Sequence, residues 1–465
     1  MQAGKQEHLP STAFPLLTLL FFMWGFITCL NDILVPHFKA VFQLSFFESS
    51  LVQFAFFGAY FFGSLVYFLF SLSGNDPIAK IGYRNGIRLG LLISAMGTLM
   101  FLPAASMVSF GFFLTALFCL ALGLALLQVA ANPFAAILGK PETASQRLNM
   151  AQALNSLGTT LAPLIGGAFI LADESVQADI KTVETPYLLL GICFLALLLL
   201  FSISKLPEYR ADSAAVKGIG ALRFPQLALG VPAIFFYVGA EVSTGSFLTS
   251  YAELPGSGGF NSKEATAFVS LYWGSLMIGR FTGTLGILKI KENIRVILSL
   301  LIPFVVFLFL MAIFAVKGIE IQAFLNYWPW LLLSGLLFWI SGHQPGRMLW
   351  LFALAAMLLI GAGVVWENKN GLWCIIAAGL FNSVMWPLIF TLAIQDLREF
   401  TSQGSSLLVM AILGGALIPP LQGWLADQAG LRISYLVPAV CMLYLVFYGF
   451  MMDRKSGKEV SLNHA

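Results

Sequence analysis

Long apolar runs, separated by short polar stretches, make up most of this chain. Each run covers roughly 20 residues or more, the length that an α-helix needs to cross the hydrocarbon core of a bilayer. Residues 1–13 are polar, and the first run is far longer than a signal-peptide core and has no small-residue cleavage site after it, so we interpret it as a retained span. Fourteen membrane-spanning helices are predicted, at residues 14–41, 47–72, 86–108, 110–138, 147–172, 185–204, 226–252, 265–288, 294–316, 323–342, 347–366, 371–395, 403–426 and 431–452.

The composition agrees with this pattern and excludes several classes of protein. Of the 465 residues, 59% are hydrophobic and only 10% are charged, which is too little charge to cover a water-facing surface. The net charge of +3 is too small to indicate a nucleic-acid partner. The five cysteines are scattered through apolar runs, and no CxxC spacing, P-loop, catalytic triad or metal cluster is visible. We therefore expect a polytopic membrane protein that is not an enzyme and holds no metal or cofactor.

The basic residues predict how the chain is oriented in the membrane. If the N-terminus is cytoplasmic, 18 of the 25 Lys and Arg residues fall on the cytoplasmic side and 6 on the other side, while Arg280 lies within a span. This excess follows the positive-inside rule. Both termini are therefore expected in the cytoplasm, and the number of spans is expected to be even.

Two glycine motifs occur twice in the chain. The Gly-x4-Gly at 58–63 returns at 274–279, at an offset of 216 residues. The longer pattern Leu-Gly-x2-Leu-x-Pro-x3-Gly occurs at 157–167 and again at 413–423, at an offset of 256. Two matches in the same order indicate an internal duplication.

The offset grows by 40 residues between the two motifs, which indicates an insertion in the second copy. Residues 293–342 contain two apolar runs that have no counterpart in the first half. We predict a six-helix bundle at 1–204, a cytoplasmic linker at 205–225, and a second six-helix bundle at 226–292 and 343–465 that the 293–342 hairpin interrupts. The hairpin is rich in Leu, Ile, Phe and Trp and almost free of charges and amides. We expect it to lie outside the other twelve helices, against lipid or another subunit.

Six stretches of sequence resemble a known family. Those in spans one, four and five resemble the fucose permease family of the major facilitator superfamily, and those in spans seven, eight and twelve look like its glucose/galactose transporter branch. The stretches are NDILVP at 31–36, QVAANPF at 128–134, RLNMAQALNS at 147–156, YVGAE at 237–241, GRFTG at 279–283 and FNSVMWP at 381–387. The resemblance covers nearly the whole chain outside the hairpin.

This resemblance implies an all-α membrane protein with the major facilitator fold, two six-helix bundles plus the inserted hairpin. It also implies proton–sugar symport by alternating access in a bacterial inner membrane. Two positions depart from the fucose permeases, which have a carboxylate in span four, where this chain has Gln128, and a glutamine in span seven, where it has Glu241. If one carboxylate has moved across the substrate, Gln128 and Glu241 should face each other across the bound sugar.

Ionisable residues inside the membrane are costly to bury and are therefore candidates for function. Asp32 follows Asn31 and precedes Pro36, a proline that removes the helical hydrogen bond to the carbonyl of Asp32. We expect a local break there, which would make Asp32 a site for a proton or a sugar hydroxyl; a helix end solvated by water is the alternative. Glu241 maps onto the middle of span one, about 10 Å from the level of Asp32, and is the second candidate for proton coupling. Arg280 either stabilises a gate or is a fixed partner of Glu241.

Neutral amides inside apolar helices are the candidate sugar ligands, because one amide offers both a donor and an acceptor without burying charge. Hydrogen bonding between helices is the competing use. The indole of Trp386 suits the apolar face of a pyranose, and Trp24 and Trp273 are secondary candidates of the same kind. Pro133, next to Asn132, is assigned a structural role. The amide candidates are Asn31, Gln128, Asn132, Gln152, Asn155, Asn382 and Gln403.

These features together indicate a secondary active sugar transporter that takes up a hexose, such as glucose or galactose, with a coupling ion expected to be H⁺. Its other partner is the lipid bilayer, and an oligomer contact at the hairpin is left open. N-acetylglucosamine or another hexose is the alternative substrate, and an uncoupled sugar facilitator or sensor is the alternative function. The presence of Asp32 and Glu241 argues against an uncoupled carrier, which has no reason to maintain buried acids.

Overall fold

Helices are the regular secondary structure in the part of the chain that the computed structural model describes, and no described residue forms a strand. Each of the fourteen predicted spans corresponds to one helix or to consecutive helices. Among the described residues, thirteen helical segments are long and apolar enough to cross a membrane, so the protein is a multi-pass membrane protein. The described residues are 13–72, 78, 81–137, 144–170, 179–204, 220–283, 285, 290–342, 344–397 and 400–463.

The helices follow one another along the chain in the predicted order. The first six spans are α1 (Ala13–Phe42), α2 (Phe46–Leu72), α4 (Tyr83–Leu99) with α5 (Phe101–Ser106), α6 (Phe110–Ile137), α7 (Ala144–Ile170) and α8 (Glu184–Ile203). The next four are α9 (Pro225–Ser246) with α10 (Leu248–Glu253), α11 (Ser262–Gly283), α12 (Glu292–Val316), and η6 (Ile321–Tyr327) with α13 (Trp328–Ile340). The last four are α14 (Pro345–Val365), α15 (Lys369–Asn382) with α16 (Met385–Ile394), α17 (Thr401–Met410) with η8 (Ala411–Leu413) and α18 (Gly414–Ala429), and α19 (Leu431–Ser434) with α20 (Leu436–Asn463). Short 3-10 helices lie at Ile180–Val183, Ala221–Arg223 and Pro255–Ser257.

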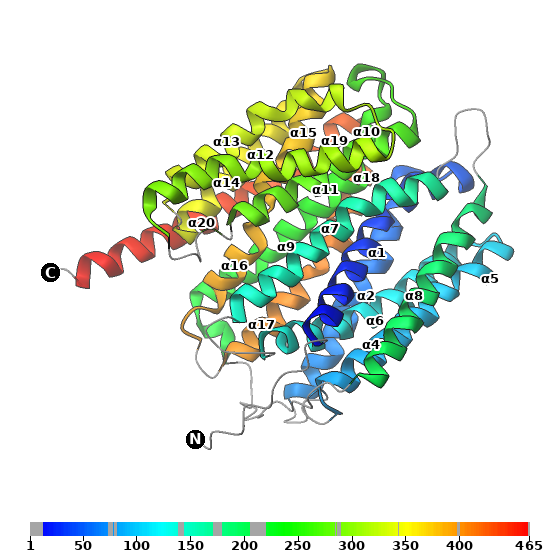
Figure 1. Cartoon of the computed structure of the whole chain (residues 1–465), viewed down its shortest axis with the longest axis horizontal. Helices are drawn as coiled ribbons and strands as arrows, with labels where there is room; N and C mark the ends of the chain where they lie inside the picture. Colours follow the sequence, from blue (N-terminus) through cyan, green and yellow to red (C-terminus); the bar gives the residue numbers. More distant parts are fainter. Residues whose placement is uncertain are drawn as a thin grey trace.

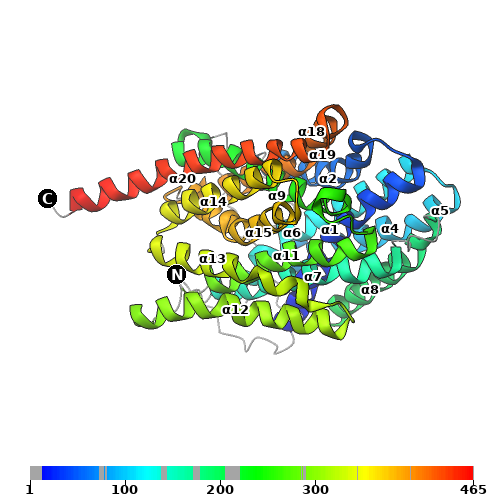
Figure 2. The same cartoon turned by 90° about the horizontal axis from the view of Figure 1, so that it is seen from above.

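The direction of the spans alternates, so that α1 begins and α20 ends on the same side of the molecule (Figure 1). We call this the terminal side and the other the distal side. We refer to α1–α8 as the first half and to α9–α20 as the second half. The halves meet along two seams, in which α2 packs along α18 and α7 packs along α11 (Figure 1 and Figure 2).

Helix α11 occupies the eighth predicted span but is not among the thirteen strongly apolar segments. Its ends carry charged residues, and its middle contains serines and glycine. Every residue from Ala265 to Gly279 is nevertheless buried, because helices of both halves surround α11. A helix that protein covers on all sides does not need an apolar face toward lipid. The low hydropathy of α11 thus reflects its central position.

Helix α1 packs closely along α7 and thereby positions the residues of the first half that face the middle of the molecule. A β-carbon at Gly25 would lie 2.1 Å from the carbonyl oxygen of Asn155, so only glycine permits this approach of the two backbones. The contact places the Asn155 side chain next to the middle of α1.

Two prolines have different effects on their helices. The expected break at Pro36 is wrong, because α1 continues through this residue to Phe42. One proline removes only one hydrogen bond of the helix, and all residues from Cys29 to Phe38 are buried among neighbours that hold the turn in place. The twelfth span, in contrast, is interrupted between Asn382 and Met385. Pro387 has no N–H to donate to the carbonyl four residues earlier, which explains this interruption.

The two inserted helices, α12 and α13, pair with each other, and α12 packs on α11. A buried hydrogen bond of 2.7 Å between the hydroxyls of Tyr327 and Ser275 fastens the hairpin to α11. The ring of Phe307 stacks on Tyr327 with the ring centroids 5.7 Å apart. The hairpin is therefore attached to the second half through α11.

Candidate functional site

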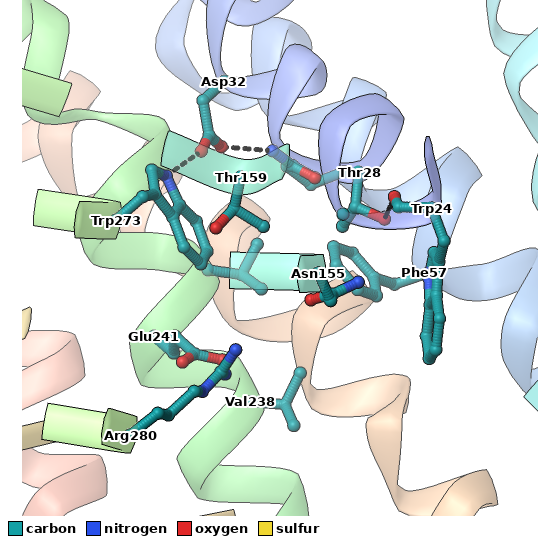
Figure 3. A pocket seen from close by; sticks show the side chains of 13 residues that line it. Trp24, Thr28, Asp32, Phe57, Asn155, Thr159, Val238, Glu241, Trp273 and Arg280 are labelled. Atoms are coloured by element: carbon teal, nitrogen blue, oxygen red, sulfur yellow. Dashed lines mark hydrogen bonds between the residues drawn. The ribbon is translucent and has the colours of Figure 1, made fainter. Parts of the chain in front are cut away.

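A cavity lies between the two halves, and its wall comes from α1, α2, α7, α9 and α11 (Figure 3). No described residue of the hairpin lines it, Phe307 and Leu332 included. The lining residues are Trp24, Gly25, Thr28, Asp32, Gln53, Phe57, Asn155, Thr159, Val238, Glu241, Val242, Trp273 and Arg280. This mixture of aromatic rings, hydroxyls, amides and two acids suits a small polar molecule that also has apolar faces.

The carboxylate of Asp32 is 1% exposed and accepts hydrogen bonds from both halves. Gln53 of α2 donates from Nε2 to Oδ1 at 3.0 Å, and Ser246 of α9 donates from Oγ to the same oxygen at 3.2 Å. The indole Nε1 of Trp273 in α11 donates to Oδ2 at 2.7 Å (Figure 3), and the thiol of Cys29 lies 3.5 Å from that oxygen. Asp32 therefore links α1 to α2, α9 and α11 on the distal side of the cavity.

These donors match an ionised carboxylate. An ionised acid only accepts hydrogen bonds, and the amide and indole N–H groups of Gln53 and Trp273 only donate. Hydrogen bonds to a charged acceptor are roughly twice as strong as neutral ones. A proton on Asp32 would weaken the contacts to both halves at once, so the charge on Asp32 affects how firmly the halves hold together.

Glu241 lies on the wall opposite α1 and is held by tyrosines of the second half. The hydroxyl of Tyr237 donates to Oε1 of Glu241 at 2.5 Å and lies 3.0 Å from the carbonyl of Asn382. The hydroxyl of Tyr272 donates to the backbone carbonyl of Glu241 at 2.9 Å and accepts from Nδ2 of Asn382 at 3.1 Å. Asn382, at the break between α15 and α16, thus contacts both of the tyrosines that hold Glu241.

Arg280 lies on the same side of the cavity as Glu241 (Figure 3). Among the described ion pairs there is none between these two residues. The Arg280 guanidinium instead donates to Oγ of Ser156 at 2.6 Å, across the seam between α11 and α7. Asn155, the neighbour of Ser156, lines the cavity and donates from Nδ2 to the carbonyl of Phe21 at 3.0 Å.

The structure brings four of the main candidates together in the cavity wall, Asp32, Asn155, Glu241 and Arg280, and the secondary candidates Trp24 and Trp273 also line it. Other candidates lie elsewhere in this conformation. Asn31 and Gln128 are buried outside the lining, and within the described part of the chain both amide atoms of Asn31 and Oε1 of Gln128 have no hydrogen-bond partner. The side chains of Asn132 and Pro133 are outside the described residues, and their roles stay predictions.

The remaining candidates are also outside the lining. Gln152 is half-buried on α7, and its backbone carbonyl accepts from Ser156. Trp386 stacks on Phe390 with the ring centroids 5.0 Å apart. Gln403 accepts the backbone N–H of Ala221 at 2.8 Å, within the predicted 205–225 linker, whose residues 205–219 lie outside the described part of the chain.

The site also contains polar residues that are not among the candidates of the sequence analysis, and Gln53, Thr28 and Thr159 are three of them. Gln53 is an amide within an apolar run and therefore carries the same sequence signal as the candidate amides. Thr28 and Thr159 give no such signal, because hydroxyls in membrane helices commonly bond the preceding turn, as Thr28 does to the carbonyl of Trp24. Trp273 was a secondary candidate for stacking on the sugar, whereas the structure shows its N–H bound to Asp32.

Comparisons with known proteins cover almost the whole chain, although no family model matches it. A glucose/galactose transporter of Brucella abortus is 41% identical over 441 residues, which are 94% of this chain and 92% of that protein. A putative glucose/galactose transporter of Helicobacter pylori is 37% identical, over 95% and 97% of the two chains. An L-fucose-proton symporter of Escherichia coli is 31% identical, over 94% and 92%.

Solved structures show the same fold. The fucose transporter FucP of the major facilitator superfamily, solved in the outward conformation, is 28% identical, with 94% of this chain and 98% of that chain covered and a TM-score of 0.64. A bacterial homolog of the human lysosomal transporter Spinster, in an inward-facing and unoccupied conformation, has the same TM-score at 14% identity, over 96% and 97% of the chains, which is a likeness of fold alone. The chain therefore belongs to the fucose permease family of the major facilitator superfamily and, within it, to the glucose/galactose transporter branch.

Proposed function

We propose that this protein takes up a hexose, such as glucose or galactose, together with protons, by alternating access. The observation that carries the proposal is the buried Asp32 carboxylate, which lines the cavity and accepts hydrogen bonds from both halves. The relatives named glucose/galactose transporter and L-fucose-proton symporter support the substrate class and the coupling ion. The protein is a carrier and not an enzyme in this proposal.

The geometry suggests how a proton couples to the movement of the halves. When the distal side is closed, Trp273 and Ser246 bring donors of the second half to Asp32, which favours the ionised acid and release of its proton. When the distal side opens, these donors move away with the second half. The carboxylate then loses part of its stabilisation and takes up a proton from the distal side.

In the proposed site, the sugar lies between the polar groups of the two halves. Asn155 and Thr159 offer an amide and a hydroxyl from α7, and Glu241 offers a carboxylate from α9. The ring of Trp24 offers an apolar surface on which the apolar face of a pyranose can stack. A sugar that contacts both walls would favour closure of the cavity around it.

We propose that the terminal side is cytoplasmic and that the membrane is the inner membrane of a bacterium, because the basic residues gather on that side. The two halves then move as two bundles, separated at the 205–225 linker. The 293–342 hairpin moves with the second half and contacts lipid or a second subunit.

Uptake of labelled sugars by cells without their own hexose uptake tests the proposal. Cells that produce the protein should accumulate glucose or galactose above the outside concentration, and a protonophore should abolish accumulation. Equal uptake with and without the protonophore would favour the uncoupled facilitator. Accumulation of N-acetylglucosamine, but of neither glucose nor galactose, would identify N-acetylglucosamine as the substrate instead. No uptake of any sugar would overturn the proposal.

A further inference from the structure

The first turn of α2 is held by a side chain of the other half of the molecule. Asp427 of α18 accepts the backbone N–H of Phe46 on Oδ1 and that of Phe47 on Oδ2, both at 2.9 Å. The first N–H groups of any helix have no partner within that helix, and a carboxylate there also complements the helix dipole. The contact lies on the distal side, where α2 begins and α18 ends.

Helix α2 also has a complete cap of its own, which makes the role of Asp427 separable from helix formation. Oγ of Ser45 accepts the N–H of Glu48 at 3.1 Å, and Oε2 of Glu48 accepts the N–H of Ser45 at 2.8 Å. This is the reciprocal arrangement known as a capping box. The two other N–H groups of the first turn, those of Phe46 and Phe47, are the ones that Asp427 binds.

The surrounding surfaces fit closely at this point. A β-carbon at Gly423 would lie 2.6 Å from the carbonyl oxygen of Phe46, so α18 touches the backbone of α2 there. The ring of Phe46 also packs against Phe247 of the second half, with the ring centroids 6.0 Å apart. Asp427 itself is exposed, so water can replace its hydrogen bonds when the two helices separate.

We propose that Asp427 is a positioning residue of the distal gate, which docks the first turn of α2 on α18 when the cavity is closed on the distal side and releases it once in each transport cycle. The assignment deepens the proposed alternating-access function and rests on it. Asp427 lies away from the sugar cavity and acts through the position of α2. Its carboxylate joins α2 to α18 at the distal surface. The hydrogen bond between Trp273 and Asp32 joins the halves deeper in the molecule, at the cavity.

The test measures the distance between the two halves on the distal side. Spin labels at Met107 and Asn370, both exposed on distal loops or helix ends, report this distance in a protein whose native cysteines are replaced. Asp427→Ala should shift the ratio of distal-open to distal-closed molecules toward open by about tenfold or more, because it removes both hydrogen bonds to the first turn of α2. Asp427→Asn keeps one acceptor oxygen and should give a smaller shift. The matched control is Glu48→Gln, which alters the same helix start within one half and should leave the ratio unchanged.

Transport kinetics give a second readout. More distal-open protein should lower the KM for sugar from the distal side and also lower the turnover, whereas a general loss of folded protein lowers only the amount of uptake. Unchanged distances in both Asp427 variants would overturn the assignment, as would failure of both to fold while Glu48→Gln folds. The distance measurement uses neither sugar nor a proton gradient, so its result is independent of whether hexose uptake is confirmed.

Discussion

Trp273 and Asp32 are joined by a hydrogen bond of 2.7 Å from the indole Nε1 to the carboxylate Oδ2, and this bond links α11 of the second half to α1 of the first. The same carboxylate is the proposed proton site. One contact therefore depends both on the charge of Asp32 and on how the halves are placed, so that protonation and closure of the distal side are coupled in free energy.

Trp273→Phe should weaken this coupling while it keeps the aromatic ring. The ionised form of Asp32 loses a charge-assisted hydrogen bond, so we expect concentrative uptake to fall about tenfold and to persist to higher pH than in the unchanged protein. Initial rates of labelled-sugar uptake over a pH series measure both effects. Trp24→Phe is the matched control, because the Trp24 indole donates to Tyr60 within the first half, at 2.9 Å. A profile that moves equally in both variants would contradict the prediction.

Asp32→Asn should separate sugar binding from proton coupling. Asparagine mimics the permanently protonated acid and keeps most of its volume, so accumulation should be abolished, with uptake no faster than equilibration. Exchange of labelled for unlabelled sugar across the membrane needs no net proton movement and should continue. Both assays can be made on the same vesicles, with and without an imposed pH gradient. Full accumulation by this variant would rule out Asp32 as the coupling acid.

The sequence predicted the spans well, because a bilayer requires long apolar runs and these are visible without any structure. It also predicted six residues of the cavity wall. Four of them, Asp32, Asn155, Glu241 and Arg280, are polar groups that an apolar helix keeps only for a reason, and the other two are the secondary candidates Trp24 and Trp273. What it did not predict is which polar groups meet. The donors to Asp32 come from α2, α9 and α11, and such pairs depend on packing between distant segments.

The sequence also does not predict how each helix is rotated about its axis, and therefore which of its residues face the cavity. Gln128 lies in a helix that is apolar on all sides, so the sequence gives no face that must point inward. The structure places Gln128 outside the cavity lining while Glu241 lines it, so the predicted pair across the sugar stays a prediction. The course of the backbone at Pro36 could not be predicted either, because the packing of neighbouring residues decides whether a proline interrupts its helix.

Glu241→Gln should weaken sugar binding and flatten its pH dependence. The neutral amide is a weaker acceptor for a sugar hydroxyl than a carboxylate, and its charge no longer varies with pH. Sugar affinity, measured by titration of the purified protein at several pH values, should drop by about tenfold where the acid is ionised and less where it is protonated. Tyr237→Phe is the control, since it removes the donor to Glu241 and leaves the acid in the wall. An unchanged affinity in Glu241→Gln would exclude contact with the sugar.

Tyr327→Phe should affect stability and not transport. The change removes the hydrogen bond between the hairpin and Ser275, whose hydroxyl still donates to the carbonyl of Leu271 at 2.7 Å, so no buried group is left without a partner. We expect a loss of about 1 kcal/mol in the free energy of unfolding. Thermal unfolding in detergent measures this loss, and uptake per folded molecule should be unaltered. Slower turnover with unchanged stability would mean that the hairpin takes part in the transport cycle.

Glu253 should make the stability of the protein depend on pH. This residue ends α10 on the distal side, beyond the strongly apolar segment Pro225–Ser246, and its carboxylate accepts a hydrogen bond from Ser262 at the start of α11. Burial raises the pKa of Glu253 above its ordinary value of 4.5, and the hydrogen bond from Ser262 and the charge of Lys39 oppose the rise only in part. An acid whose pKa is higher in the folded than in the unfolded protein stabilises the fold below its ordinary pKa, and this stabilisation is lost as the pH rises through the folded value.

Glu253→Gln should therefore melt at a higher temperature than the unchanged protein at neutral pH, by roughly 1–2 °C, because glutamine keeps an acceptor for Ser262 without a charge. The difference between the two proteins should shrink in acid, where Glu253 is protonated. Melting curves in detergent at acidic and neutral pH measure both values. Glu264→Gln is the control, since Glu264 lies exposed near the same end of α11. If Glu253→Gln instead melts lower than the unchanged protein at neutral pH, the charge of Glu253 stabilises the distal loop, and Lys39 and Ser262 outweigh the cost of burial.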